Sequence, residues 1–169
     1  MDEHRLGLKP ILRRVWARRG QRPVVAVRPR YEWLWVYGFV RPTTGETWWL
    51  VLPRVNTEAM SRTLAAFAQA VGAGPTRRVV LLLDQAGWHT SREVVVPAGI
   101  TLVLLPSRSP ELQPAERLWG QVDAAIANRV WETLDELETA VVERCRTLRE
   151  KMGEAVRRLT CYHWWPAFA

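Results

Sequence analysis

The sequence predicts a single α/β domain over all 169 residues, with a mixed central β-sheet flanked by α-helices. Two segments rich in Trp, Val and Leu, residues 32–40 and 46–52, enclose a turn containing Pro and Gly and predict an antiparallel hairpin. Two continuous apolar runs, residues 79–83 and 100–105, are typical of parallel strands buried on both faces. The hairpin and the parallel pair together predict the mixed sheet.

Local signals along the chain predict the remaining elements. Residues 3–8 alternate weakly, as in a short strand, and we expect the first half of this strand to be missing. Asn56 is placed to cap a helix whose apolar residues recur at helical spacing. Residues 87–96 have room for a short helix between the two apolar runs, which implies a right-handed crossover. A helix from Pro114 to about Asn128 is expected after the second run.

One long final helix is predicted for the last part of the chain. Thr133 and Glu136 have the spacing of a capping box at its start. Its apolar stripe is formed by Leu137, Val141, Cys145, Leu148, Met152, Val156 and Leu159.

Composition excludes several classes of protein. The two cysteines lie outside any CxxC or Cys/His cluster, which argues against a disulfide framework or a zinc site and predicts free thiols. The sequence contains no apolar run of about eighteen residues and no charged-then-apolar leader. We therefore expect a cytoplasmic protein without a membrane partner.

The net charge of +7 is concentrated in the first third of the chain. Residues 1–54 hold eleven Lys and Arg against four acidic residues, whereas residues 55–169 hold thirteen of each. The stretch of residues 9–30 contains no acidic residue and eight basic ones, namely Lys9, Arg13, Arg14, Arg18, Arg19, Arg22, Arg28 and Arg30. Such a segment is typical of a phosphate-binding surface, so we expect nucleic acid as a partner. A general preference for Arg over Lys in the composition would produce the same excess.

Two carboxylates are expected at one edge of the sheet. Asp84 directly follows the run 79–83, and because burying an unpaired carboxylate is costly, it should lie at the carboxyl end of that strand, where ligand sites gather. Glu116 falls in the first turn of the helix after the next strand, where the helix dipole favours its charged form. Oxygen ligands without His or Cys favour magnesium or manganese. Taken singly, a capping role explains Asp84 and a dipole role explains Glu116.

The surroundings of these two acids resemble a known family. The relevant stretches are Asp84-Gln-Ala-Gly-Trp-His89 and Leu104-Leu-Pro-Ser-Arg-Ser-Pro-Glu-Leu-Gln-Pro-Ala-Glu-Arg-Leu-Trp119. Both resemble the DDE transposases of the mariner superfamily, in the bacterial insertion-sequence branch, where a loop of the pattern LPxxSPELxPxExxW carries the last acid of a catalytic triad. The resemblance implies that Asp84 and Glu116 are the second and third carboxylates. The stretch from Asp2 to Leu8 resembles the first catalytic segment, which implies that Asp2 is the first.

The resemblance implies a fold, a reaction and partners. The fold would be RNase H-like, and the reaction would be DNA strand cleavage and strand transfer by two-metal phosphoryl transfer. Asp2, Asp84 and Glu116 would be both the catalytic residues and the ligands of two Mg²⁺ or Mn²⁺ ions. The partners would be DNA, as element ends and target, and a second copy in a homodimer, with no small-molecule substrate and a location at the bacterial nucleoid.

Strand and helix geometry indicates which neighbouring residues can reach the site. His89 is expected to contact the carboxylates or DNA, unless it only packs or caps a helix. Glu3 follows Asp2 on a strand, so the two side chains should face opposite sides. Asp123 should lie roughly 10 Å along the helix from Glu116, outside the site.

Some positions depart from the family pattern. Gln85 and Gln113 stand where Asn is frequent, and Ser107-Arg108 stands where Pro-Tyr is frequent, but none of these changes removes a proposed ligand. The family also carries helix-turn-helix segments before the catalytic domain, and we expect none here. An alternative function therefore stays open, in which a truncated or domesticated fragment binds DNA through its basic first third without catalysis.

Overall fold

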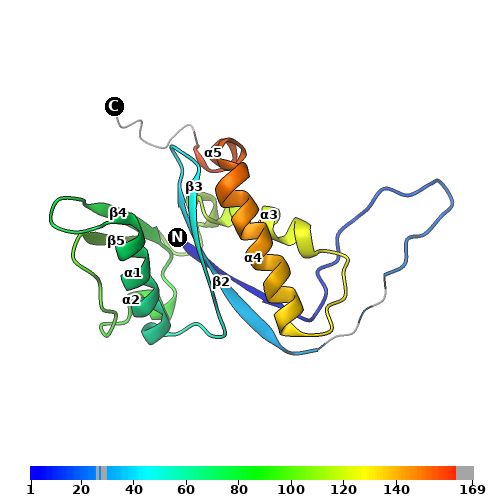
Figure 1. The fold of residues 1–169 in the computed structure, drawn as a ribbon, viewed down its shortest axis with the longest axis horizontal. Helices are drawn as coiled ribbons and strands as arrows, with labels where there is room; N and C mark the ends of the chain where they lie inside the picture. Colours follow the sequence, from blue (N-terminus) through cyan, green and yellow to red (C-terminus); the bar gives the residue numbers. More distant parts are fainter. Residues whose placement is uncertain (26, 28–29, 163–169) are drawn as a thin grey trace.

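The computed structural model describes residues 1–25, 27 and 30–162, in which helices lie on both sides of the three-stranded sheet β1–β3 (Figure 1). The elements in chain order are β1 (Asp2–Gly7), β2 (Trp33–Arg41), β3 (Glu46–Leu52), α1 (Thr57–Val71), β4 (Val79–Leu83), α2 (Gly87–Thr90), β5 (Ile100–Leu104), η1 (Pro110–Leu112), α3 (Glu116–Ile126), α4 (Leu134–Lys151) and α5 (Gly153–Thr160).

The strands form two sheets, one antiparallel and one parallel. β1, β2 and β3 pair in that order and antiparallel, and β4 and β5 form a parallel pair. The backbone nitrogen of Met1 donates to the carbonyl of Leu82 at 2.7 Å, so the start of β1 lies beside the end of β4. Asp2 therefore lies close to the carboxyl end of β4, which Asp84 follows.

Alternation of side chains along β2 divides the interior into two cores. Leu34 and Val36 point to one face and pack with α3, α4 and α5. Tyr37 and Phe39 point to the other face and pack with α1, β4 and β5. The same alternation on β1 turns Asp2 and Glu3 to opposite faces, because successive strand residues point in opposite directions.

The parallel strands are less buried than the sequence suggested. Their inner face packs on α1 through Leu81 and Leu83, but Val80 and Val103 are 65% and 41% exposed. The prediction of strands buried on both faces is therefore wrong, because no element of the described chain covers the outer face of this pair. A continuous apolar run alone does not indicate how many faces are covered.

The start of α1 agrees with the prediction, whereas α3 begins later than predicted. Asn56 caps α1 as predicted, accepting from the backbone nitrogen of Ala59 at 2.7 Å. α3 begins at Glu116, two residues after Pro114, which lies in a turn. None of the helices in the described ranges is long and apolar enough to cross a membrane.

The predicted final helix is divided into α4 and α5. The division falls at Met152, whose backbone is not helical (φ −123°, ψ 18°). The turn between β2 and β3 packs here, since a Cβ at Gly45 would lie only 1.9 Å from the carbonyl oxygen of Gly153. The predicted stripe is buried as far as Leu148 and again at Val156, whereas Leu159 is exposed.

The connection between β1 and β2 forms a long arm that projects from the body (Figure 1). We define the arm as residues 8–32, of which 26, 28 and 29 lie outside the described residues. Its base is fixed to the start of the α3–α4 connection, where the side chain of Asn128 accepts from the nitrogen of Arg13 at 2.9 Å and donates to its carbonyl at 3.0 Å. Beyond that base, the side chain of Trp16 is fully exposed.

Gly38 lies where the indole of Trp119 crosses β2. A Cβ at Gly38 would lie 2.8 Å from Cη2 of Trp119 and 3.0 Å from Cζ3 of Trp49. We expect Gly38→Ala to lower the free energy of unfolding by about 1–3 kcal/mol, because two packed rings must move. Gly120→Ala is the control, since its Cβ would meet nothing within 4 Å, and it should stabilise α3 by roughly 0.5–1 kcal/mol. Urea denaturation compares the two, and similar effects would contradict the packing described.

Candidate active site

Three carboxylates from separate elements line one small hollow. Asp2 begins β1, Asp84 directly follows β4, and Glu116 is the first residue of α3. The hollow has a volume of about 100 Å³, and its remaining lining residues are Leu105, Pro106, Arg108, Ser109, Pro110 and Gln113. The structure thus brings together the three acids that the sequence proposed as ligands, although their roles stay predictions.

Asp2 is held by one hydrogen bond from α3. Its side chain is largely buried, and Nε1 of Trp119 donates to its Oδ2 at 2.6 Å. Trp119 is itself stacked on the ring of His4, with 4.9 Å between the ring centroids. Burial raises the pKa of Asp2 and the nearby charge of Glu3 adds to this, while the hydrogen bond from Trp119 opposes it.

Asp84 is held through one of its two oxygens. Its Oδ1 accepts from the backbone nitrogen of Ala86 at 3.0 Å and from Nδ1 of His89 at 2.7 Å. The Asp84 side chain is 56% exposed, whereas the His89 side chain is fully buried. His89 therefore contacts a proposed ligand from inside the protein.

Glu3 is the residue that the sequence argument did not include in the site. As expected, it faces away from Asp2, but its Oε1 lies 2.9 Å from Nε2 of His89. Burial lowers the pKa of His89, but hydrogen bonds and charge from Glu3 and Asp84 outweigh it and raise the pKa overall. Glu3 is separated from His89 by 86 residues, so no local pattern indicated this pair.

Glu116 does not behave as the helix dipole alone suggested. Burial raises its pKa, and the charges of Asp2 and Asp84 raise it further against an opposing effect of His4. The helix dipole, which favours the charged form, therefore acts against burial and the two neighbouring carboxylates. The Glu116 carboxylate makes no hydrogen bond to any residue that the structure describes.

The donor set suits a hard divalent cation. Mg²⁺ and Mn²⁺ prefer carboxylate oxygens, and here three carboxylates repel one another around a single hollow. Arg108 lines the same hollow with an unusual backbone (φ 60°) but forms no ion pair within the described chain. Among the described residues, no three His, Cys, Asp or Glu side chains already converge closely enough to hold one ion.

Other predicted residues lie outside the hollow. Asp123 pairs with Nε2 of His4 at 2.9 Å and with Arg13 at 3.3 Å. Arg30 is also fixed to the protein, donating to the carbonyl of Glu132 at 2.6 Å. The basic side chains of the arm that make no hydrogen bond or ion pair within the described residues are Lys9, Arg14, Arg18, Arg19 and Arg22. Arg28 lies outside the described residues.

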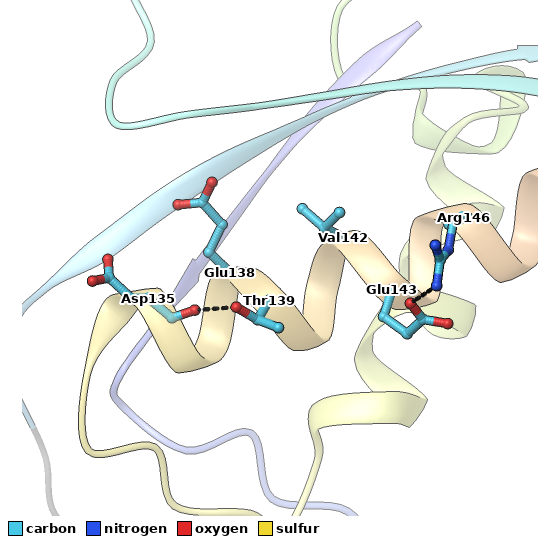
Figure 2. A pocket seen from close by; sticks show the side chains of 6 residues that line it. All are labelled: Asp135, Glu138, Thr139, Val142, Glu143 and Arg146. Atoms are coloured by element: carbon cyan, nitrogen blue, oxygen red, sulfur yellow. Dashed lines mark hydrogen bonds and ion pairs between the residues drawn. The ribbon is translucent and has the colours of Figure 1, made fainter.

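A larger hollow of about 470 Å³ lies on α4, and all its lining residues come from that helix (Figure 2). Two of its members are joined as an ion pair, Arg146 with Glu143, and the hydroxyl of Thr139 donates to the carbonyl of Asp135. One helix surface brings in no groups from other elements, so this hollow lacks the convergence of the carboxylate site. Its acids are useful controls for that site.

Sequence comparisons identify one family. Residues 1–138 match the family described as DDE superfamily endonuclease. An uncharacterized protein of Sinorhizobium fredii (strain NBRC 101917 / NGR234), y4pE/y4sA, is 43% identical over 108 residues, which are 63% of this chain and 78% of that protein.

Structural comparisons give the fold. The Mos1 mariner paired end complex with Mn matches with a TM-score of 0.62 and 17% identity, over 95% of this chain and 55% of that one. The Mos1 mariner paired end complex with Mg gives 0.58 and 17%, over 95% and 54%. The Mos1 Strand Transfer Complex gives 0.56 and 18%, over 95% and 53%. The RNase H-like fold is confirmed, and the chain spans about half the length of these solved chains.

The destabilising effect of the buried Asp2 charge can be tested by the free energy of unfolding. Asp2→Asn should raise the free energy of unfolding by about 1 kcal/mol near pH 7 in EDTA, because the amide oxygen still accepts from Trp119 while the buried charge is gone. The raised pKa of Asp2 means that the folded state binds its proton more tightly than the unfolded chain. The wild type should therefore lose stability relative to the variant as pH rises from about 4 through that raised pKa. Urea denaturation checks this, and a less stable variant near pH 7 would contradict it.

Proposed function

The chain belongs to the DDE superfamily endonucleases, and we propose that it is the catalytic core of a transposase, which cuts DNA strands and joins them to a target. The observation that carries this proposal is the hollow at which Asp2, Asp84 and Glu116 meet. The acids come from two neighbouring strand ends and one helix start, where phosphoryl-transfer sites of open α/β sheets are expected.

In the proposed reaction the three carboxylates hold two divalent cations. Bound cations would supply Lewis acidity at phosphorus and a water or 3′-hydroxyl of lowered pKa, with in-line displacement and no covalent enzyme intermediate. Asp84 would hold a cation through Oδ2, because its side chain is much more exposed than that of Asp2 and Oδ2 has no hydrogen bond from the described residues. Asp2 contributes its Oδ1, since Oδ2 is bound to Trp119. Glu116 completes the set from the other side of the hollow.

The structural relatives support the metal and the DNA partner. The matching Mos1 complexes are named with Mn, with Mg and with a left transposon end. We propose the same cations and the same kind of DNA partner for this chain. We also propose a homodimer, because a second copy would provide one site for each of two DNA ends.

The proposed ligands can be tested by their effect on strand cleavage. Asp84→Asn and Glu116→Gln should each lower the rate of plasmid nicking with Mn²⁺ by roughly a thousandfold, as expected when one member of a cooperating catalytic group is lost. The matched control is the double variant Asp135→Asn and Glu138→Gln, which removes two acids from the hollow on α4. Gel-based nicking assays should show the control at wild-type rate. Equal losses in all variants, or none, would contradict the assignment.

A second candidate function is DNA binding without catalysis, and the arm favours it. Four of its arginines make no hydrogen bond or ion pair with the described residues, and the indole of Trp16 among them is fully exposed. Exposed cations of this kind contact phosphates, and aromatic rings stack on bases.

The contribution of the arm to DNA binding can be measured directly, and nicking by the wild type then distinguishes the two candidates. Changing Arg14, Arg18, Arg19 and Arg22 together to Gln should weaken DNA binding and lower the slope of log K against log salt by about 3. A charge-matched control changes four exposed arginines elsewhere, namely Arg77, Arg78, Arg92 and Arg149, to Gln. Fluorescence anisotropy over a salt series measures both. Salt-sensitive binding by a wild type that never nicks DNA would favour the second candidate.

A further inference from the structure

A buried row of three side chains leads from the interior to the carboxylate hollow. Oε1 of Glu3 lies 2.9 Å from Nε2 of His89, and Nδ1 of His89 lies 2.7 Å from Oδ1 of Asp84. The side chains of Glu3 and His89 are 3% and 0% exposed, whereas that of Asp84 is 56% exposed. The row therefore begins in the core and ends at a proposed ligand.

The burial of Glu3 needs an explanation. A buried carboxylate is expensive unless it is hydrogen-bonded. The bond to His89 is the one polar contact that the described residues provide to the Glu3 carboxylate. Glu3 lies opposite Tyr37 in the pairing of β1 with β2, and Tyr37 packs in the same core as Leu83. An apolar residue at this position would pack as well, so packing alone does not account for Glu3.

The row determines how Asp84 presents its carboxylate. Oδ1 accepts two hydrogen bonds from different directions, from the nitrogen of Ala86 at 3.0 Å and from His89. Two donors on one oxygen restrict rotation of the carboxylate and leave Oδ2 free. Trp119 does the same for Asp2, since it holds Oδ2 and leaves Oδ1 free.

We propose that Glu3 and His89 are positioning residues, which fix the ring of His89 so that Asp84 offers only Oδ2 to a divalent cation. The proposal rests on the metal site of the proposed function. Partners that orient a ligand from behind commonly change metal affinity by about 10–100-fold when they are lost. Glu3 touches neither the cation nor the DNA, and it acts only through His89.

Direct Mn²⁺ binding to the full chain tests this without reference to cleavage. In titrations followed by electron paramagnetic resonance, Glu3→Met should raise the Kd for Mn²⁺ by at least about tenfold. Glu3→Gln should stay within about threefold of wild type, because its amide oxygen still accepts from Nε2 of His89. His89→Phe, which keeps the ring but removes both donors, should weaken binding as much as Glu3→Met.

The double variant Glu3→Met with His89→Phe separates positioning from folding. Replacing both partners of a buried polar pair by apolar groups leaves no unpaired group, so this variant should melt near the wild-type temperature. It should still bind Mn²⁺ at least about tenfold more weakly. The control is Val141→Ala on α4, which removes buried volume far from the hollow and should lower the melting temperature with an unchanged Kd.

Several outcomes would overturn the proposal. Wild-type Mn²⁺ affinity in the folded double variant would show that the row does not position Asp84. A Glu3→Gln variant as weak as Glu3→Met would show that charge, and not the hydrogen bond, is what matters. Weakening by Val141→Ala to the same degree would assign the effect to stability. A wild type that binds no Mn²⁺ would contradict the proposed metal site itself. A wild type that binds Mn²⁺, with variants whose Kd for Mn²⁺ is unchanged, would contradict the positioning role alone.

Discussion

The hydrogen bond from the indole of Trp119 to Asp2 connects the two halves of the candidate site. It ties α3 to the first strand at 2.6 Å in a buried environment, where a charge-assisted bond is strong. Glu116 precedes Trp119 by three residues on the same helix, so the bond also brings Glu116 to the strand edge. The ring fits there because β2 has Gly38 opposite Asp2 in the strand pairing. A site built from β1 and α3 thus depends on one glycine, one indole and one carboxylate.

Electrostatics at this edge oppose stability in the absence of a cation. The pKa values of Asp2 and Glu116 are both raised, because burial disfavours both charged forms, with added repulsion from Glu3 at Asp2 and from Asp2 and Asp84 at Glu116. Closely spaced acids with raised pKa values destabilise a fold, and proteins tolerate this cost mainly at functional sites. Oδ1 of Asp2 and Oδ2 of Asp84 accept no hydrogen bond from a side chain of the described residues, which leaves them available to a ligand. This arrangement of held and available oxygens supports the proposed site for hard cations.

Much of the fold follows from local sequence. The hairpin, the parallel pair and the cap at Asn56 are set by side-chain alternation, apolar runs and capping chemistry, and these were predicted correctly. Asp84 and Glu116 could be placed because strand ends and helix starts determine where their side chains emerge. The family motifs around these two acids could be recognised because each motif is continuous in sequence.

The features that were missed depend on contacts between distant segments. The apolar stripe continues in phase across Met152, so only the packing of the β2–β3 turn against Gly153 reveals the break between α4 and α5. The exposure of Val80 and Val103 depends on what covers the sheet, which an apolar run does not specify. The raised pKa of Glu116 depends on burial and on the charges of Asp2 and Asp84, and the pairing of Glu3 with His89 joins residues from different elements.

The central claim is that Asp2, Asp84 and Glu116 together bind divalent cations. The most direct measurement is the anomalous difference map from crystals soaked in Mn²⁺, for the wild type and for Asp84→Ala. If the three carboxylates bind cations, manganese peaks are expected in the hollow beside Asp84 in the wild type, and none in the variant. A wild-type hollow without manganese, or peaks that persist unchanged in Asp84→Ala, would contradict it.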